Sequence, residues 1–227
     1  MEKALTFAEK NRPDVLRINE IFYSIQGEGS RAGEPCVFIR LTGCGLRCTY
    51  CDTEYAFYQG EDSSFENILD RVRSYSCNFV ELTGGEPLEQ EAVYPLMKIL
   101  CDQGFDVSIE TGGHVNISRV DRRVMRIVDL KTPSSGMESR NYLKNIEYLQ
   151  SNDEIKFVIG SKEDYLWSKQ RIEALGLPEK VNTILMSPVR EILEPSDLAR
   201  WILEDKLPVR LQLQLHKIVW PGVERGV

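Results

Sequence analysis

Three cysteines, Cys44, Cys48 and Cys51, stand four and three residues apart in the segment CVFIRLTGCGLRCTYCDT. A short glycine-containing loop lets three thiolates at this spacing converge on one metal centre. Cubane iron-sulfur clusters usually have four cysteine ligands, but no fourth cysteine belongs to this loop. Three protein ligands leave one iron open, and an open position distinguishes catalytic metal sites from closed structural ones. We therefore expect a catalytic 4Fe-4S cluster here.

Two other interpretations of the triplet are a structural zinc site and chance clustering of thiols. Zinc would need a fourth ligand such as His114, His216 or a distant cysteine, and none of these has the paired ligand motif of zinc folds. We interpret His114 as a loop histidine. The remaining cysteines, Cys36, Cys77 and Cys101, are predicted to be reduced and to serve as small buried hydrophobic residues.

Polar residues flank the triplet in the stretch EIFYSIQGEGSRAGEPCVFIRLTGC. Gln26 offers amide donors and acceptors, Glu28 a carboxylate and Arg40 a guanidinium that can bind a carboxylate through two hydrogen bonds. About 40 residues after the triplet, LTGGEP (82–87) has glycines that would let backbone groups approach a ligand closely. Each segment alone would be an ordinary turn or ion pair, but their proximity to the triplet favours a ligand site.

Apolar, β-rich runs alternate with helical patterns along the chain, which is typical of repeated βα units around a parallel sheet. The predicted strands cover residues 15–22, 36–43, 79–83, 106–111, 126–131, 155–159, 183–187 and 209–220. The predicted helices cover residues 65–75, 90–104, 141–149, 162–176 and 195–206. Residues 132–142 are predicted to form a mobile loop.

Seven unusual segments fall at the carboxyl ends of these strands, which is the edge that holds the active site in βα barrels. They are LTGC, LTGGEP, IETGG, DLKTPSS, FVIGS, MSPV and LQLHK. We predict an α/β fold, an incomplete TIM-like barrel of about six βα units with an N-terminal strand and lid. One domain covers residues 1–227, with an extension at 1–30 and a final strand and tail at 209–227. In that strand Arg210, Gln212, Gln214 and His216 would share one face.

Composition excludes several classes of protein. The chain has 227 residues, of which 42% are hydrophobic and 28% charged, as in globular proteins. No apolar run approaches the roughly 18–20 residues of a membrane span, and the charged start MEKALTFAEKNRPDVLRINE differs from a secretory signal. A cytoplasmic protein is expected. The net charge of -7 disfavours non-specific binding to nucleic acid.

The CxxxCxxC triplet and the GGEP segment resemble those of the radical S-adenosylmethionine (SAM) superfamily. There, three thiolates hold a 4Fe-4S cluster whose open iron binds SAM, and reduction gives a 5'-deoxyadenosyl radical. From Ile21 to Lys217 the chain is also similar to the 7-carboxy-7-deazaguanine synthase family, in the segments IFYSIQGEG, RLTGC, CDT, TGGEP, ETGG, DLKTPSS and LQLHK. This resemblance implies a lyase that converts 6-carboxy-5,6,7,8-tetrahydropterin to 7-carboxy-7-deazaguanine with loss of ammonia, in queuosine and 7-deazapurine biosynthesis.

The resemblance also assigns site residues by position. It implies substrate contacts at Ile25, Gln26, Gly27, Glu28, Arg40, Thr83 and His216. It implies SAM contacts at Tyr50, Gly84, Gly85, Glu86, Lys131, Pro133, Ser134 and Ser187. Thr53 would bind Mg²⁺ through its hydroxyl group, and no side chain would act as a catalyst beyond the cluster and the SAM-derived radical.

The same resemblance implies a homodimer that takes electrons from a donor such as flavodoxin or ferredoxin. Two other functions stay open on the sequence. One is a glycyl-radical-activating enzyme, which shares the triplet and the partial barrel but acts on a protein. The other is a non-catalytic metal-binding module of the same fold.

Overall fold

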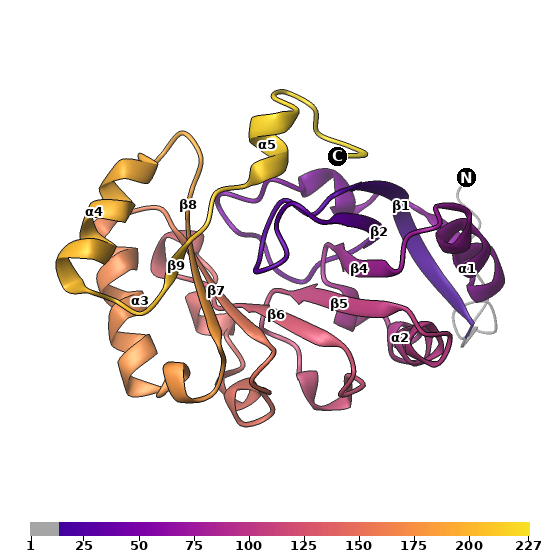
Figure 1. Cartoon of the computed structure of the whole chain (residues 1–227), viewed down its shortest axis with the longest axis horizontal. Helices are drawn as coiled ribbons and strands as arrows, with labels where there is room; N and C mark the ends of the chain where they lie inside the picture. Colours follow the sequence, from indigo (N-terminus) through magenta and orange to yellow (C-terminus); the bar gives the residue numbers. More distant parts are fainter. Residues whose placement is uncertain (1–13) are drawn as a thin grey trace, which may run out of the picture.

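The computed structural model of the chain describes residues 14–227 and is built on one nine-stranded sheet (Figure 1). The strand order is β3-β1-β2-β4-β5-β6-β7-β8-β9. The strands are β1 (Val15–Ile25), β2 (Pro35–Leu41), β3 (Glu61–Ser64), β4 (Phe79–Gly84), β5 (Asp106–Thr111), β6 (Met125–Asp129), β7 (Glu154–Ile159), β8 (Thr183–Pro188) and β9 (Arg210–Leu211). The first part of the expected extension, and with it most of the charged start, lies outside the described residues.

The sheet is parallel from β2 to β9, and β1 and β3 add two antiparallel strands at one edge. The prediction of a mostly parallel α/β fold is therefore confirmed. Strand β3 was not predicted, because its sequence, EDSS, lacks the β-branched and aromatic residues typical of strands. It pairs with β1 over four residues, from Val15 opposite Ser64 to Ile18 opposite Glu61.

Four long helices lie in the connections between strands (Figure 1). They are α1 (Phe65–Ser74), α2 (Val93–Asp102), α3 (Lys162–Ala174) and α4 (Pro195–Asp205). The segment 141–149, predicted to be a helix, forms only a 3-10 turn over Leu143–Glu147, and the predicted loop 132–142 contains two more such turns. None of the helices within residues 14–227 has the length and apolar character needed to cross a membrane.

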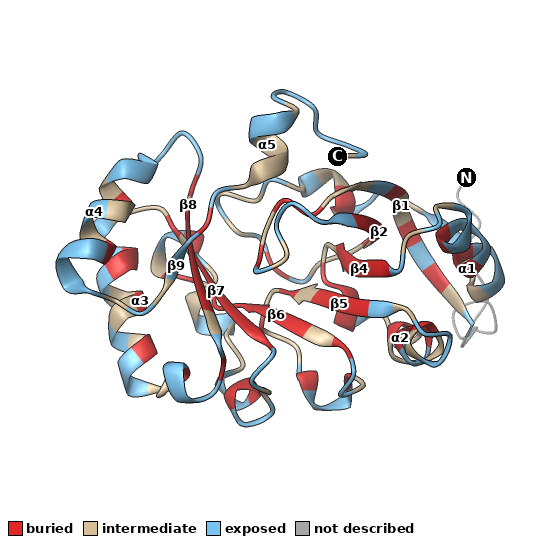
Figure 2. Ribbon diagram, viewed as in Figure 1, coloured by how far each residue is buried: buried red, intermediate tan, exposed pale blue. Residues whose placement is uncertain are grey.

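The hydrophobic core lies between the helices and the sheet, and Figure 2 shows the central strands buried along most of their length. Helix α2 contributes a fully buried face of Val93, Leu96, Met97 and Leu100. Helices α1 and α3 begin at serines that accept a hydrogen bond from the backbone N–H three residues later, which is a common start of a helix. Strands that are apolar towards the helices are free to carry polar residues on their other face.

The predicted final strand 209–220 is wrong beyond its first residues. Strand β9 ends at Leu211, and a short helix α5 (Leu215–Val219) follows. The backbone N–H of Gln212 still bonds to the carbonyl of Met186, but that of Leu215 bonds to the carbonyl of Gly27 instead. The chain therefore leaves the sheet and crosses to the QGEG segment, so the four polar residues do not share a strand face.

We predict that a buried ion pair between β6 and the turn before β7 is essential for stability. Asp153 is fully buried and accepts hydrogen bonds from the backbone N–H of Arg126 (2.9 Å) and from its Nε (3.0 Å). In Asp153→Ala the buried guanidinium has no counterion, so the free energy of unfolding should fall by about 3–5 kcal/mol, measured by anaerobic urea denaturation. Asp70→Ala, which removes an exposed pair with Arg73, is the control. Equal effects of the two substitutions would contradict the prediction.

Candidate active site

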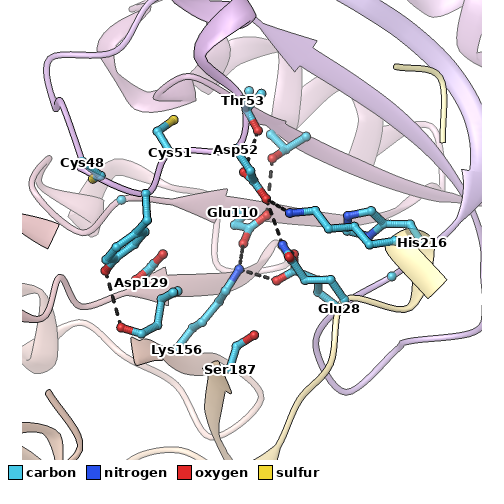
Figure 3. Close-up of a pocket in the computed structure, with 18 of the residues that line it drawn as sticks. Glu28, Cys48, Cys51, Asp52, Thr53, Glu110, Asp129, Lys156, Ser187 and His216 are labelled. Atoms are coloured by element: carbon cyan, nitrogen blue, oxygen red, sulfur yellow. Dashed lines mark hydrogen bonds and ion pairs between the residues drawn. The ribbon is translucent and has the colours of Figure 1, made fainter. Parts of the chain in front are cut away.

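A cavity of about 450 Å³ opens at the carboxyl ends of the parallel strands, and its lining comes from almost every part of the chain (Figure 3). Strands β2, β4, β5, β6, β7 and β8 contribute residues, together with the QGEG segment, the cysteine loop and α5. All seven predicted substrate contacts, the three cysteines and Thr53 line this one cavity. The structure thus brings together residues that the sequence separates by up to 191 positions, from Ile25 to His216.

The cysteine loop places all three thiols on the cavity, and they are only partly buried. The backbone N–H of Leu46 points at the sulfur of Cys44 (3.4 Å). Burial raises the pKa of the Cys44 thiol to about 11 and also raises the pKa values of Cys48 and Cys51. Thiols of this kind become thiolate ligands when a bound metal displaces their protons.

The donor set suits a cluster with one open iron, because three free cysteine thiols of one loop line the cavity. Within residues 14–227, no three His, Cys, Asp or Glu side chains surround a single ion position. A cubane instead takes each thiolate on a different iron, so its ligands stand farther apart. His114, one of the histidines that zinc would need, is held by Glu89 (2.9 Å).

The GGEP segment packs directly beneath the cysteine loop. The backbone N–H of Glu86 donates to the carbonyl of Gly43 (2.7 Å), and a Cβ on Gly85 would lie 2.0 Å from that same carbonyl oxygen. Any side chain at residue 85 would therefore push the two segments apart. Glu89, three residues after Glu86, supports the same end of the loop, because its carboxylate accepts from the N–H of Gly45 (3.0 Å).

Two further residues hold the GGEP turn in place. His114 lies in a loop, as predicted, and its nearly buried side chain pairs with Glu89. Glu86, assigned to SAM, is fully buried and does not line the cavity. Its carboxylate accepts from Thr111 Oγ1 (2.9 Å) and the N–H of Gly112 (2.8 Å). His114 and Glu86 thus stabilise the GGEP turn.

The other predicted SAM contacts divide into two groups. Tyr50, Gly84, Gly85, Lys131 and Ser187 line the cavity. Pro133 and Ser134 do not, because they form a 3-10 turn that is held away from it. The N–H of Ser134 bonds to the carboxylate of Asp164 (2.8 Å) at the start of α3. SAM contact by Pro133, Ser134 and Glu86 remains a prediction.

Gln26 uses its side-chain amide within the protein. Its Nε2 donates to Glu81 Oε2 (2.5 Å), and its Oε1 accepts from the N–H of Glu28 (3.1 Å). The side chain of Gln26 therefore holds the QGEG turn in shape, and residues 25–28 line the cavity. Arg40 donates through Nε to Glu20 (2.8 Å), directly opposite it in the β1–β2 register, and its guanidinium also lines the cavity.

The segment 212–217 closes over the QGEG turn. A Cβ on Gly27 would lie 2.1 Å from His216 Nδ1, so only glycine permits this contact. Gln214 donates to both Glu28 (2.8 Å) and Asp52 (3.0 Å). Burial opposes ionisation of Asp52, but the ion pair with Lys217 outweighs it and holds the pKa of that carboxyl well below its usual range.

Charged side chains on the sheet form the floor of the cavity, and sequence reasoning missed them. They are Glu81 on β4, Glu110 on β5, Asp129 on β6 and Lys156 on β7. The available signal was a charged residue inside each of the apolar strands FVELT, DVSIET, RIVDLK and IKFVI. Alternate residues of a strand face the same side, so these charges lie on the face opposite the helices.

Glu81 is the most deeply buried of these acids. Its Oε2 also accepts from Ser108 Oγ (2.8 Å) on the neighbouring strand β5. Burial raises the pKa of Glu81 to about 8, and the negative charges of Glu110 and Glu28 add to this effect. Glu81 therefore binds a proton more readily than an ordinary glutamate.

Similarity to known proteins identifies the superfamily and the family of the chain. Residues 38–202 match the radical SAM superfamily, and the chain belongs to that superfamily. It is 47% identical over 215 residues to 7-carboxy-7-deazaguanine synthase of Chlorobaculum tepidum, across 93% of this chain and 97% of the relative. The enzyme of that name from Koribacter versatilis is 41% identical, across 93% and 100%. The chain is thus a member of the 7-carboxy-7-deazaguanine synthase family.

A solved structure agrees with this membership. The crystal structure of QueE from Escherichia coli superposes on the chain with a TM-score of 0.74 and 26% sequence identity. The match covers 89% of this chain and 95% of that one. The sheet and the helices around the cavity therefore follow the family's fold over nearly the whole length.

The raised pKa of Glu81 predicts how stability depends on pH. Between its ordinary pKa and about 8, folding takes up a proton at Glu81, so the free energy of unfolding falls as the pH rises through this window. Glu81→Gln removes this titration. Between about pH 6 and about pH 9, the free energy of unfolding should fall less in Glu81→Gln than in the unchanged protein. The difference, measured by urea denaturation, should be at least about 1 kcal/mol. Exposed Glu147→Gln is the control, and parallel curves for all three proteins would contradict the assignment.

Proposed function

We propose that the chain converts 6-carboxy-5,6,7,8-tetrahydropterin to 7-carboxy-7-deazaguanine with loss of ammonia, by a radical ring contraction in 7-deazapurine biosynthesis. One observation carries the proposal: the cysteine triplet, a cavity-facing arginine and a charged floor line a single cavity. Membership of the 7-carboxy-7-deazaguanine synthase family supports the same reaction. No comparable set of observations supports a glycyl-radical-activating enzyme or a non-catalytic metal-binding module.

Cys44, Cys48 and Cys51 would hold the 4Fe-4S cluster. Tyr50, Lys131 and Ser187 surround the space beside the thiols, and the two glycines of GGEP leave it open for SAM. When bound, the cluster and SAM supply one-electron hydrogen abstraction. The protein's own residues bind the two ligands beside each other and cover them.

The remaining walls suit a substrate with one carboxylate and several N–H groups. The guanidinium of Arg40 has donors left over after its bond to Glu20, and these would bind the carboxylate. Glu28 and Glu110 would accept hydrogen bonds from ring N–H groups. His216 would close the cavity over Gly27. The reaction rearranges atoms within the substrate and releases ammonia, so it requires no net redox change.

Thr53 is suited to binding Mg²⁺ together with the substrate. Its hydroxyl faces the cavity and donates to Asp52 Oδ1 (3.0 Å), so a hard oxygen ligand and a carboxylate lie side by side. Mg²⁺ rarely uses a cage made only of protein groups and keeps water or substrate oxygens as ligands. One hydroxyl from the protein is compatible with this preference.

Further parts of the proposal rest on the family resemblance. We propose that the curved sheet is a truncated barrel of about six βα units, and that the chain acts as one domain. We also propose a cytoplasmic homodimer reduced by a flavodoxin or a ferredoxin. Contacts of Ile25 and Thr83 with substrate belong to the same proposal, because both residues line the cavity.

Turnover tests the function directly. Anaerobically reconstituted protein with SAM, Mg²⁺, a reductant and 6-carboxytetrahydropterin should form a deazapurine, detected by its ultraviolet absorption and mass, and should regenerate SAM. Cys48→Ala should lose both product formation and the roughly four irons and four sulfides per chain. An intact cluster with no deazapurine formed would refute the proposal. Bound zinc without sulfide would instead favour the metal-binding module.

The pair between Glu20 and Arg40 predicts a defect in substrate binding. Glu20→Gln weakens the ionic hydrogen bond that orients the guanidinium, so KM should rise by about tenfold while kcat changes less. Tyr55→Phe, which removes a hydroxyl donor to the same carboxylate, should have a smaller effect. Cluster content should be equal in both variants. An unchanged KM in Glu20→Gln would refute the role of Arg40 in binding the carboxylate.

A further inference from the structure

A buried ammonium joins two carboxylates in the floor of the cavity. Lys156 on β7 donates through Nζ to Glu110 Oε1 on β5 (2.6 Å) and to Glu28 Oε2 in the QGEG segment. The side chain of Lys156 is 8% exposed. Figure 3 shows the two interactions converging on the nitrogen of Lys156.

The surroundings make Lys156 the shared counterion of these two acids. The charged groups that face Glu110 are Lys156, Glu28 and Asp129, with Glu81 deeper on β4. The ammonium of Lys131 pairs with Asp129 (2.7 Å). Glu28 receives two further hydrogen bonds from Gln212 and Gln214, and Glu110 receives one from Thr83 Oγ1. The neutral donors orient the carboxylates, and Lys156 supplies the positive charge between them.

Lys156 itself is unsuited to transferring protons. Burial opposes its charge, but Glu110 and Glu28 outweigh burial and raise its pKa well above the ordinary value. Burial likewise raises the pKa of Glu110, and the attraction of Lys156 partly offsets that effect. For Glu28 the attraction outweighs burial and lowers the pKa. The ammonium therefore remains charged and acts on its neighbours by electrostatics.

We propose that Lys156 is a positioning residue, whose ammonium holds Glu110 and Glu28 in place as acceptors for the N–H groups of the bound ring. This inference rests on the proposed function for the identity of the substrate. A reduced pterin has N–H donors on both of its rings, and a carboxylate accepts from such donors through either oxygen. A protonated carboxyl would present one donor of its own, which would face an N–H group unfavourably.

The test compares Lys156→Gln with Lys156→Arg. Glutamine removes the charge, so KM for 6-carboxytetrahydropterin should rise by about tenfold or more. The acid limb of kcat/KM should also move to higher pH, because Glu110 without its cation binds a proton more readily. Lys156→Arg keeps the charge and should leave the acid limb in place. Lys169→Met, which removes a surface pair with Asp205, is the control and should match the unchanged protein.

A second measurement does not depend on turnover. At neutral pH, the infrared difference spectrum of Lys156→Gln should contain an additional band from a protonated carboxyl group. The double variant, Lys156→Gln with Glu110→Gln, should lack this band. If the single variant does not fold, Lys156→Gln with Glu28→Gln removes one charge of each sign, and the same band is sought there. An unmoved acid limb together with no new band would overturn the inference. Failure of the unchanged protein to form the deazapurine would instead refute the proposed function.

Discussion

The buried ammonium of Lys156 holds together parts of the molecule that hydrophobic packing does not. The strands are fixed by their apolar face against the helices, but the QGEG segment and the segment 212–217 lie over the polar face. Lys156 ties Glu28 to the sheet, and Glu28 in turn binds Gln212 and Gln214. Removing one member of such a buried set leaves an uncompensated charge. The geometry of the cavity therefore depends on this interaction.

The same network reaches the proposed metal site. Gln214 and Lys217 both contact Asp52, which lies between Cys51 and Thr53. The GGEP turn and Glu89 hold the opposite end of the cysteine loop. The loop is thus fixed at both ends, by the sheet through one set of contacts and by the C-terminal segment through the other. This arrangement explains how residues far apart in sequence can act on ligands bound side by side.

Much of the fold was predictable because its strands are apolar and bounded by turns. The segment 106–111 was predicted with its exact limits. Strand β3 was missed because its polar sequence forms a strand only by pairing with β1. The alternation in LQLQL was misleading: β9 ends at Leu211, Gln212 makes the last backbone hydrogen bond to β8, and the N–H of Leu215 bonds to the carbonyl of Gly27 instead.

The site was predictable where short motifs lie close to the cysteines, and much less so elsewhere. The cavity does bring together the triplet, QGEG and Arg40. Glu110 and Lys156 belong to no recognisable sequence motif. The role of a charged residue within an apolar strand can be inferred only when the strands beside it are known. Gln26 contributes differently from what its chemistry suggested, since Glu81 and the N–H of Glu28 occupy its amide.

A crystal structure of the anaerobically reconstituted protein with SAM and 6-carboxytetrahydropterin tests the central claim most directly. The account predicts a 4Fe-4S cluster on Cys44, Cys48 and Cys51, with the pterin in the cavity, its carboxylate on Arg40 and its N–H groups facing Glu110 and Glu28. A pterin bound outside this cavity, or one whose N–H groups face away from both carboxylates, would contradict it.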